Sequence, residues 1–158
     1  MPRLRIQQQL KKPVVTIRRG VGGPTKLVYV AVANKALTYR LKKSPIVYIG
    51  TTSRGLIRIL ESAGARTERI LSRHGVKKIH FFVVTCTARQ KTKSWELLER
   101  ALILRFRELH GDIPLENTML KNNTDQSWED LFDRKQLDKV LSSYKTPSKK
   151  GKSKKSLP

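Results

Sequence analysis

Glu99 is an acidic residue in surroundings that call for a positively charged partner. It lies in a helical segment with Leu102, Ile103 and Phe106, whose spacing indicates a largely apolar face. A carboxylate is costly to bury unless a cation pairs with it. The sequence therefore predicts a metal ion or an arginine beside Glu99. Glu96, one turn earlier on the same face, competes for the metal, although its place in the first helical turn already suits the helix dipole.

Two tyrosines and an arginine form a second set of residues that could do chemistry. Tyr29 and Tyr48 occupy equivalent positions near the middles of two apolar segments, and Arg58 follows ten residues after Tyr48. If those segments are adjacent strands and Arg58 lies two turns into the next helix, the three side chains converge. Taken singly, each tyrosine is an ordinary strand aromatic, so the set carries meaning only as a group.

Three segments are typical of β-strands, the elements that must hold the tyrosines. Residues 26–32, 46–50 and 77–86 are rich in β-branched and aromatic side chains. The polar stretch 34–45 between the first two is expected to be a loop or a strand extension. These two neighbouring segments suggest a β-hairpin that carries both tyrosines.

Helical periodicity predicts four further elements. Segments 54–64 and 65–75 each end in a glycine and are interpreted as two short helices. The longest helix is expected over 95–111, and a final amphipathic helix over 127–144. Thr52 or Ser53 is expected to cap the first helix, and Ser94 is expected to cap the long helix. The expected apolar stripe of the first helix consists of Leu56, Ile59 and Leu60.

The order of these elements predicts the fold class. Two strands, two helices, a strand, a long helix and a final helix indicate an α+β domain with a small three-stranded, mostly antiparallel sheet flanked by helices. A chain of 158 residues suffices for one compact domain with a modest core. Its expected parts are a basic N-terminal arm at 1–25, the folded domain at 26–120, a helical extension at 121–144 and a disordered Lys-rich tail at 145–158.

The charge of the chain points to a polyanionic partner. Lys and Arg number 34 against 12 Asp and Glu, which gives a formal net charge of +22. No Asp or Glu occurs before Glu61. Charge of this size opposes a compact chain unless a polyanion neutralises it, and nucleic acid is the commonest one in a cell.

Several other features are set aside. The stretch GVGGPTK from Gly20 lacks the residues and the following helix of a phosphate-binding loop. The three histidines and Cys86 are not at metal-ligand spacing, and a lone thiol in a strand is usually core filler. No apolar run reaches the roughly 20 residues that a membrane span requires, so we expect no membrane partner.

The residues singled out above resemble the signature of a known family. Leu27-Val28-Tyr29 departs from the family's first tripeptide in one residue, and Tyr48-Ile49-Gly50 matches its second one in full. The residues that follow in the family's order are Arg58, Glu99 before Ala101-Leu102-Ile103, and Pro114-x-x-Asn117. Over residues 26–120 the chain thus resembles the GIY-YIG endonucleases, which occur among excision-repair, homing and restriction enzymes.

The resemblance implies hydrolysis of DNA phosphodiester bonds. Glu99 would hold one Mg²⁺ or Mn²⁺ whose other ligands are waters and a phosphate oxygen. Tyr29 would be the general base, and Tyr48 would orient the water or the phosphate. Arg58 would clamp the scissile phosphate, and Asn117 would buttress the site.

Cationic residues near this site are expected to face the nucleic-acid backbone. Arg58 is expected to lack an acidic partner within the protein because a phosphate takes that place. Arg54 could contact the same strand, although an exposed and solvated helix face is the favoured interpretation for it. Further candidates for nucleic-acid contacts are Lys42, Lys43, Arg66 and Arg69.

Two residues depart from the family's pattern. Many members carry a Lys directly after the second signature and a His or Tyr one turn after the arginine. Thr51 and Ser62 occupy those positions here. Neither supplies the usual proton donor, so slower or differently arranged catalysis is expected.

Other functions stay open at this point. The rival hypothesis is a non-catalytic nucleic-acid-binding protein of architectural or ribosomal type, which the basic charge fits equally well. A homodimer or a partner that supplies sequence specificity is also compatible with the sequence, and RNA remains a possible substrate. The expected location is the cytoplasm, in association with the nucleoid.

Overall fold

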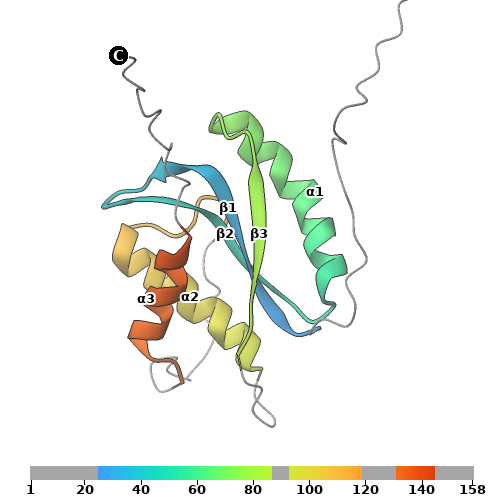
Figure 1. Cartoon of the computed structure of the whole chain (residues 1–158), viewed down its shortest axis with the longest axis vertical. Coiled ribbons are helices and arrows are strands. Elements are labelled where there is room, and N and C mark those ends of the chain that lie inside the picture. Colours follow the sequence, from blue (N-terminus) through green and yellow to red (C-terminus); the bar gives the residue numbers. More distant parts are fainter. Residues whose placement is uncertain (1–24, 87–92, 119–130, 145–158) are drawn as a thin grey trace, which may run out of the picture.

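The computed structural model describes residues 25–86, 93–118 and 131–144. No helix within these ranges is long and apolar enough to cross a bilayer. The elements, in chain order, are β1 (Leu27–Thr38), β2 (Lys43–Thr52), α1 (Leu56–Arg73), β3 (Ile79–Val84), α2 (Ser94–His110) and α3 (Arg134–Ser143) (Figure 1).

The described strands form one antiparallel sheet in the order β2-β1-β3. The central strand, β1, is buried on both faces over residues 27–33. Its continuous apolar sequence is what such a position requires. The α+β fold with a three-stranded antiparallel sheet, predicted from the sequence, is confirmed.

Helices cover the two faces of this sheet. Figure 1 shows α1 on one side and α2 with α3 on the other. Alternate side chains of β1 supply the two interfaces. Tyr29 packs in a small cluster with Leu27 and with Ile59 of α1, whereas Val30 joins a larger core that contains Leu102 of α2.

The stretch 34–45 is largely a strand extension. β1 continues to Thr38 and β2 begins at Lys43, although the pairing register shifts between Val32 and Leu37. Of the two alternatives given by the sequence, the strand extension is therefore confirmed for most of this stretch.

The prediction of two short helices at 54–75 is wrong, because α1 is a single helix that passes through Gly64. A glycine costs a helix interior only about 1 kcal/mol, which packing against the sheet outweighs. Ile59 and Ile70 lie three turns apart, on either side of Gly64 in the chain, and both are buried. The helix thus keeps one face toward the sheet along its length.

The predicted apolar stripe of the first helix is also wrong in part. Ile59 is buried, but Leu56 and Leu60 are 46% and 54% exposed. The buried face of α1 passes through Ile59 and Ile70, and Arg66 shares that face at helical steps of seven and four residues. A charged residue therefore lies on the side of α1 that packs against the sheet.

The predicted helix caps differ from those observed. Gly55, with a φ of 65°, is the N-cap of α1, and no side chain caps that helix. The Thr52 hydroxyl instead accepts a hydrogen bond of 2.9 Å from the backbone N–H of Arg54. Lys93 is the N-cap of α2, and Ser94 is its first residue.

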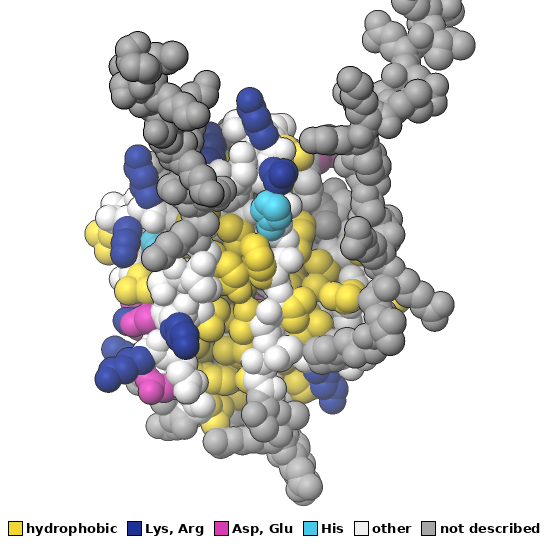
Figure 2. All heavy atoms as spheres, in the orientation of Figure 1, with side chains coloured by type: hydrophobic (Ala, Val, Ile, Leu, Met, Phe, Trp, Pro, Cys, Tyr) yellow, Lys and Arg dark blue, Asp and Glu magenta, His cyan; other side chains and the backbone are white. Residues whose placement is uncertain are grey.

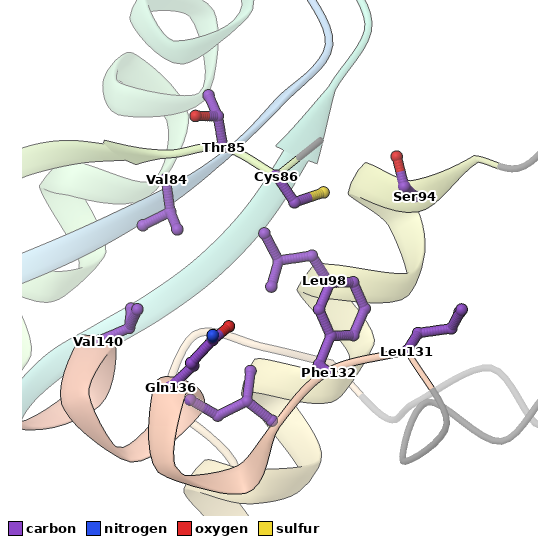
Figure 3. A pocket seen from close by; sticks show the side chains of 10 residues that line it. Val84, Thr85, Cys86, Ser94, Leu98, Leu131, Phe132, Gln136 and Val140 are labelled. Atoms are coloured by element: carbon purple, nitrogen blue, oxygen red, sulfur yellow. The ribbon is translucent and has the colours of Figure 1, made fainter. Parts of the chain in front are cut away.

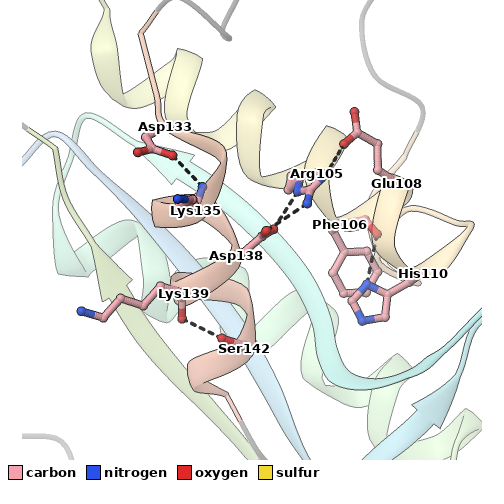
Figure 4. A network of polar contacts seen from close by, with 9 residues as sticks. All are labelled: Arg105, Phe106, Glu108, His110, Asp133, Lys135, Asp138, Lys139 and Ser142. Carbon is pink, nitrogen blue, oxygen red and sulfur yellow. Dashed lines mark hydrogen bonds and ion pairs between the residues drawn. The ribbon is translucent and has the colours of Figure 1, made fainter.

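The final helix, α3, begins at Arg134 and is shorter than the predicted 127–144, of which residues 127–130 lie outside the described ranges. The carboxylate of Asp133 caps it by accepting the Lys135 N–H. Leu137 is buried against the core. Arg105 of α2 donates two hydrogen bonds, of 2.7 and 2.9 Å, to Asp138 of α3 (Figure 4). This bidentate pair fixes α3 against α2.

A cavity of about 370 Å³ lies between the end of β3, the start of α2 and α3. Figure 3 shows Cys86, Ser94, Leu98 and Phe132 on its walls. Cys86 lies just beyond the end of β3 and packs in part against the main core. The thiol therefore belongs to an apolar wall, as a small hydrophobic side chain does.

Candidate active site

Tyr29 and Tyr48 lie side by side on the face of the sheet that α1 covers. The residue opposite Tyr29 on β2 is Gly50, and the one opposite Tyr48 on β1 is Ala31. The tyrosines are thus diagonal neighbours, offset by two residues, and their ring centroids are 5.8 Å apart. The convergence predicted from the sequence is present for this pair, with a diagonal offset in place of equivalent positions.

Gly50 explains why the two rings can lie so close together. A Cβ atom at this position would lie 2.5 Å from Cε1 of Tyr48 and 2.8 Å from Cζ of Tyr29. Real Cβ atoms essentially never approach other atoms so closely. Glycine is therefore required at this point of β2, because both rings converge over its backbone.

Glu99 reaches the same end of β2 from α2. Its carboxylate accepts a hydrogen bond from the backbone N–H of Thr51. Burial, followed by the charge of Glu96, raises the pKa of Glu99 to about 7, and the Thr51 hydrogen bond only partly opposes this. Glu96 itself is about half-exposed and forms an ion pair of 3.4 Å with Lys93. Glu99 is thus the more buried of the two candidate metal ligands.

Asn117 braces the outer edge of β2. Its side-chain amide accepts the Ile49 N–H at 2.9 Å and donates to the Ile49 carbonyl at 2.7 Å. The Glu116 N–H donates to the carbonyl of Val47 at 3.0 Å. Together with the Glu99–Thr51 bond, these contacts satisfy backbone groups at alternate residues of an edge strand, which would otherwise remain open.

Arg66 lies over the ring of Tyr48. Its guanidinium carbon is 4.1 Å from the ring centroid, and Nη1 donates to the Glu116 carbonyl at 3.0 Å. The pKa of Tyr48 is raised, mainly by burial and then by Tyr29, while Arg66 acts in the opposite direction and Glu99 adds to the rise. Tyr48 therefore keeps its proton at neutral pH and can donate a hydrogen bond.

The expectation that Arg58 lacks an acidic partner is wrong. Arg54 and Arg58 both contact the Glu61 carboxylate, at 2.6 and 3.1 Å respectively. All three side chains are substantially exposed, between 44% and 59%. Glu61 lies one turn after Arg58, already within the predicted helix 54–64, so the helix itself supplies the acid. The interactions described for Arg58 are on this exposed side of α1, and they place it with neither tyrosine.

The remaining predicted nucleic-acid contacts fall into two places. Arg69 forms an ion pair of 3.4 Å with the buried carboxylate of Glu116, close to Arg66. Lys42 and Lys43 are exposed at the turn between β1 and β2. That turn is at the opposite end of β2 from Thr51, roughly 30 Å away for a strand of 10 residues.

Thr51 and Ser62 are the two residues that depart from the family's pattern. The Thr51 hydroxyl donates a hydrogen bond of 3.1 Å to the carbonyl of Leu27 and so joins β2 to β1. The side chain of Ser62 lies outside the described residues. Thr51 thus contributes to the sheet with its hydroxyl and to the Glu99 contact with its backbone.

Sequence reasoning gave no role at this site to Glu116, and it assigned Arg66 to nucleic acid and not to Tyr48. The spacing of Ile59, Arg66 and Ile70 indicates that Arg66 faces the sheet, but only if residues 56–73 are treated as one helix. Glu116 precedes the predicted Asn117, and its buried carboxylate was detectable only from the pairing with Arg69.

The donor set at Glu99 fits a cation site of one particular kind. No group of three or more His, Cys, Asp and Glu side chains gathers in the described part of the chain, so a fully protein-ligated metal has no site there. A single buried carboxylate suits Mg²⁺ or Mn²⁺, which keep waters and phosphate oxygens as their other ligands. A cation there would offset the cost of ionising Glu99.

Comparisons of this chain with protein-family models, with curated proteins and with solved structures found no match.

Proposed function

We propose that this protein is a divalent-metal-dependent endonuclease that hydrolyses phosphodiester bonds in DNA. The observation that carries the proposal is the convergence of Tyr29, Tyr48 and the partly buried Glu99 at one end of β2. A partly buried carboxylate beside two packed phenols is costly to keep ionised. A hydrolytic site uses all three groups.

Each tyrosine has a distinct role in the proposed reaction. Tyr48 keeps its proton, so it donates a hydrogen bond that orients the attacking water or a phosphate oxygen. Tyr29 accepts the proton of the water as general base. The Tyr29 ring centroid is 5.8 Å from that of Tyr48, and the guanidinium of Arg66 lies over the Tyr48 ring, so a positive charge is close to the pair.

Glu99 would hold Mg²⁺ or Mn²⁺, which when bound supplies positive charge for the phosphate and the departing 3′ oxygen. The contribution of the protein is to keep this carboxylate in place through the Thr51 N–H and to keep it in a partly dry environment. Asn117 holds the same strand through its two bonds to Ile49, so it positions the site without touching substrate.

The interactions described for Arg58 are with Glu61 and not with the tyrosines, so it would clamp the scissile phosphate only after the phosphate has displaced Glu61. Its pair with Glu61 is exposed, and water and salt screen pairs of this kind so that they contribute little stability. A phosphodiester group, which also carries one negative charge, can therefore replace Glu61 at small cost. Arg54 shares the same carboxylate and would be released together with Arg58.

One observation favours the non-catalytic alternative. The Glu99 carboxylate satisfies the Thr51 N–H on the edge of β2, which is a structural use for it. A basic nucleic-acid-binding protein of architectural or ribosomal type would need nothing more from Glu99. The two hypotheses differ in what the loss of this charge does to cleavage and to binding.

Nicking of supercoiled plasmid by the purified protein distinguishes these hypotheses. We expect nicking with Mg²⁺ or Mn²⁺, none with EDTA, and a loss of at least about a hundredfold in Glu99→Gln, with DNA binding kept or tightened because a negative charge is removed. Glu96→Gln, one turn away and half-exposed, is the matched control and should retain activity. Binding without metal-dependent cleavage in the unaltered protein would favour the architectural alternative.

A further inference from the structure

A second candidate binding site lies on the opposite face of the sheet. A cavity of about 530 Å³ is bounded by β1, by the start of β3 and by the end of α3, and its lining includes Asn34, Lys78, His80, Phe82 and Tyr144. Phe82 is opposite Val30 of β1. Its neighbour Phe81 lies on the other face, with its ring centroid 6.4 Å from that of Tyr29. The cavity is thus separated from the tyrosine site by the sheet itself.

Aromatic rings line this cavity in a row. The ring centroids of His80 and Phe82 are 6.2 Å apart, and those of Phe82 and Tyr144 are 5.0 Å apart. Phe82 is 42% exposed, which is unusual for a phenylalanine that already packs against two other rings. Rings that present an open face to solvent are what a nucleic-acid base stacks upon.

A lysine is held at the rim of the cavity by backbone contacts. The Asn34 side-chain oxygen accepts the N–H groups of Lys77 and Lys78 at 3.1 and 3.3 Å, and the Asn34 N–H donates to the Lys78 carbonyl at 3.0 Å. These bonds fix the chain at Lys78, which is one of the residues that line the cavity, whereas Lys77 is not. A phosphate next to a stacked base would meet this ammonium group.

Charge around the cavity selects the kind of ligand. Figure 2 shows hydrophobic side chains along the middle of the face that carries β3, with histidine and basic side chains at its upper end. The chain as a whole carries +22, and the sequence directly after Tyr144 contains lysines and no acid. An anion that also offers a flat aromatic group complements this surface.

We propose that this cavity binds an unpaired base of a single-stranded nucleic acid, stacked against Phe82 and Tyr144, with Lys78 at the adjoining phosphate. The bases of a duplex are stacked on one another and do not enter such a cavity, so the site selects single strands. Its volume is in the range of sites for small organic groups. The site requires no cleavage, so it is independent of the reaction proposed for the tyrosines.

Fluorescence anisotropy of labelled oligothymidylate tests this assignment, with EDTA present throughout so that cleavage does not contribute. Phe82→Leu keeps an apolar side chain but removes the ring, and we expect it to weaken binding about tenfold. Val83→Ala is the matched control, since Val83 is next in the same strand, is 44% exposed and does not line the cavity. Equal affinities of these two variants would overturn the proposal.

A lysine pair gives a second comparison that does not disturb the edge strand. Lys78→Gln and Lys77→Gln remove the same charge from adjacent, exposed positions, but only Lys78 lines the cavity. We expect the affinity for oligothymidylate to fall more in Lys78→Gln. Circular dichroism establishes that each variant is folded. Equal losses in the two lysine variants would mean general electrostatic attraction and would contradict the site.

Two further ligands separate the proposed ligand from related ones. Direct binding of a labelled duplex of the same length should not differ between Phe82→Leu and Val83→Ala, and a difference of about tenfold there would overturn the selection of single strands. Thymidine monophosphate should compete only weakly, because it lacks the neighbouring phosphates. Displacement by the mononucleotide as effective as that by unlabelled oligomer would identify a free-nucleotide site and would overturn the assignment to a strand.

Discussion

At the scale of single residues, Glu99 makes the folded protein sensitive to pH. Its pKa is raised by burial and by Glu96 to about 7, above the value near 4.5 of an exposed glutamate. The folded state therefore binds the proton more tightly than the unfolded state. The stability that this provides is fully present below pH 4.5 and is lost as the pH rises toward 7.

We accordingly expect Glu99→Gln to be more stable than the unaltered protein above pH 7. The difference should approach about 3 kcal/mol at pH 8 and vanish near pH 4.5, since the amide mimics the protonated acid. Urea unfolding at both pH values measures it. Glu96→Gln, whose carboxylate is half-exposed, should show only a small part of this effect. A difference in unfolding free energy that does not change with pH would contradict the raised pKa of Glu99.

At the scale of elements, α1 carries a weak point at Gly64. This glycine lies inside the helix, and a Cβ atom there would meet nothing within 4 Å. We expect Gly64→Ala to stabilise the protein by about 0.5–1 kcal/mol, because alanine loses less backbone freedom on folding. Urea unfolding measures the gain. Gly50→Ala is the opposite case, since its Cβ would collide with both tyrosine rings, and it should destabilise by about 1–3 kcal/mol.

The elements also show how far the sequence could be used for prediction. The three strands, the long helix and the tyrosine pair were predictable, because alternation and β-branched residues define buried strands. The continuity of α1 was not, because Gly64 is also a helix-stop signal and its small cost is outweighed only by packing. That error concealed the inward side of Arg66, whereas Glu61 lies one turn after Arg58 within the predicted helix 54–64 and could have been identified as its partner from the sequence.

Other parts of the site depend on contacts between distant segments. The bonds of Asn117 to Ile49 and of Glu116 to Arg69 join residues far apart in the chain. No local pattern encodes such pairings. The resemblance to a family indicated Asn117 but gave no reason to single out Glu116.

At the scale of the whole molecule, α3 depends on α2 for its position. The Arg105 side chain, only 16% exposed, donates to Asp138 of α3 and to Glu108 of its own helix. We expect Asp138→Asn to destabilise the protein by about 1 kcal/mol, since it weakens a bidentate bond between helices. Urea unfolding measures the loss. Glu108→Gln removes a contact within α2 alone and should have a smaller effect, and the reverse order would contradict this account.

The edge of β2 has a consequence for synthesis of the chain on the ribosome. Its backbone groups are satisfied by Glu99, Glu116 and Asn117, all of which are translated long after β2 itself. Until Asn117 has left the exit tunnel, the nascent sheet presents an open strand edge, the kind of surface on which chains associate wrongly. A chain that is interrupted between β3 and Asn117 would therefore be prone to aggregate even though all three strands are present.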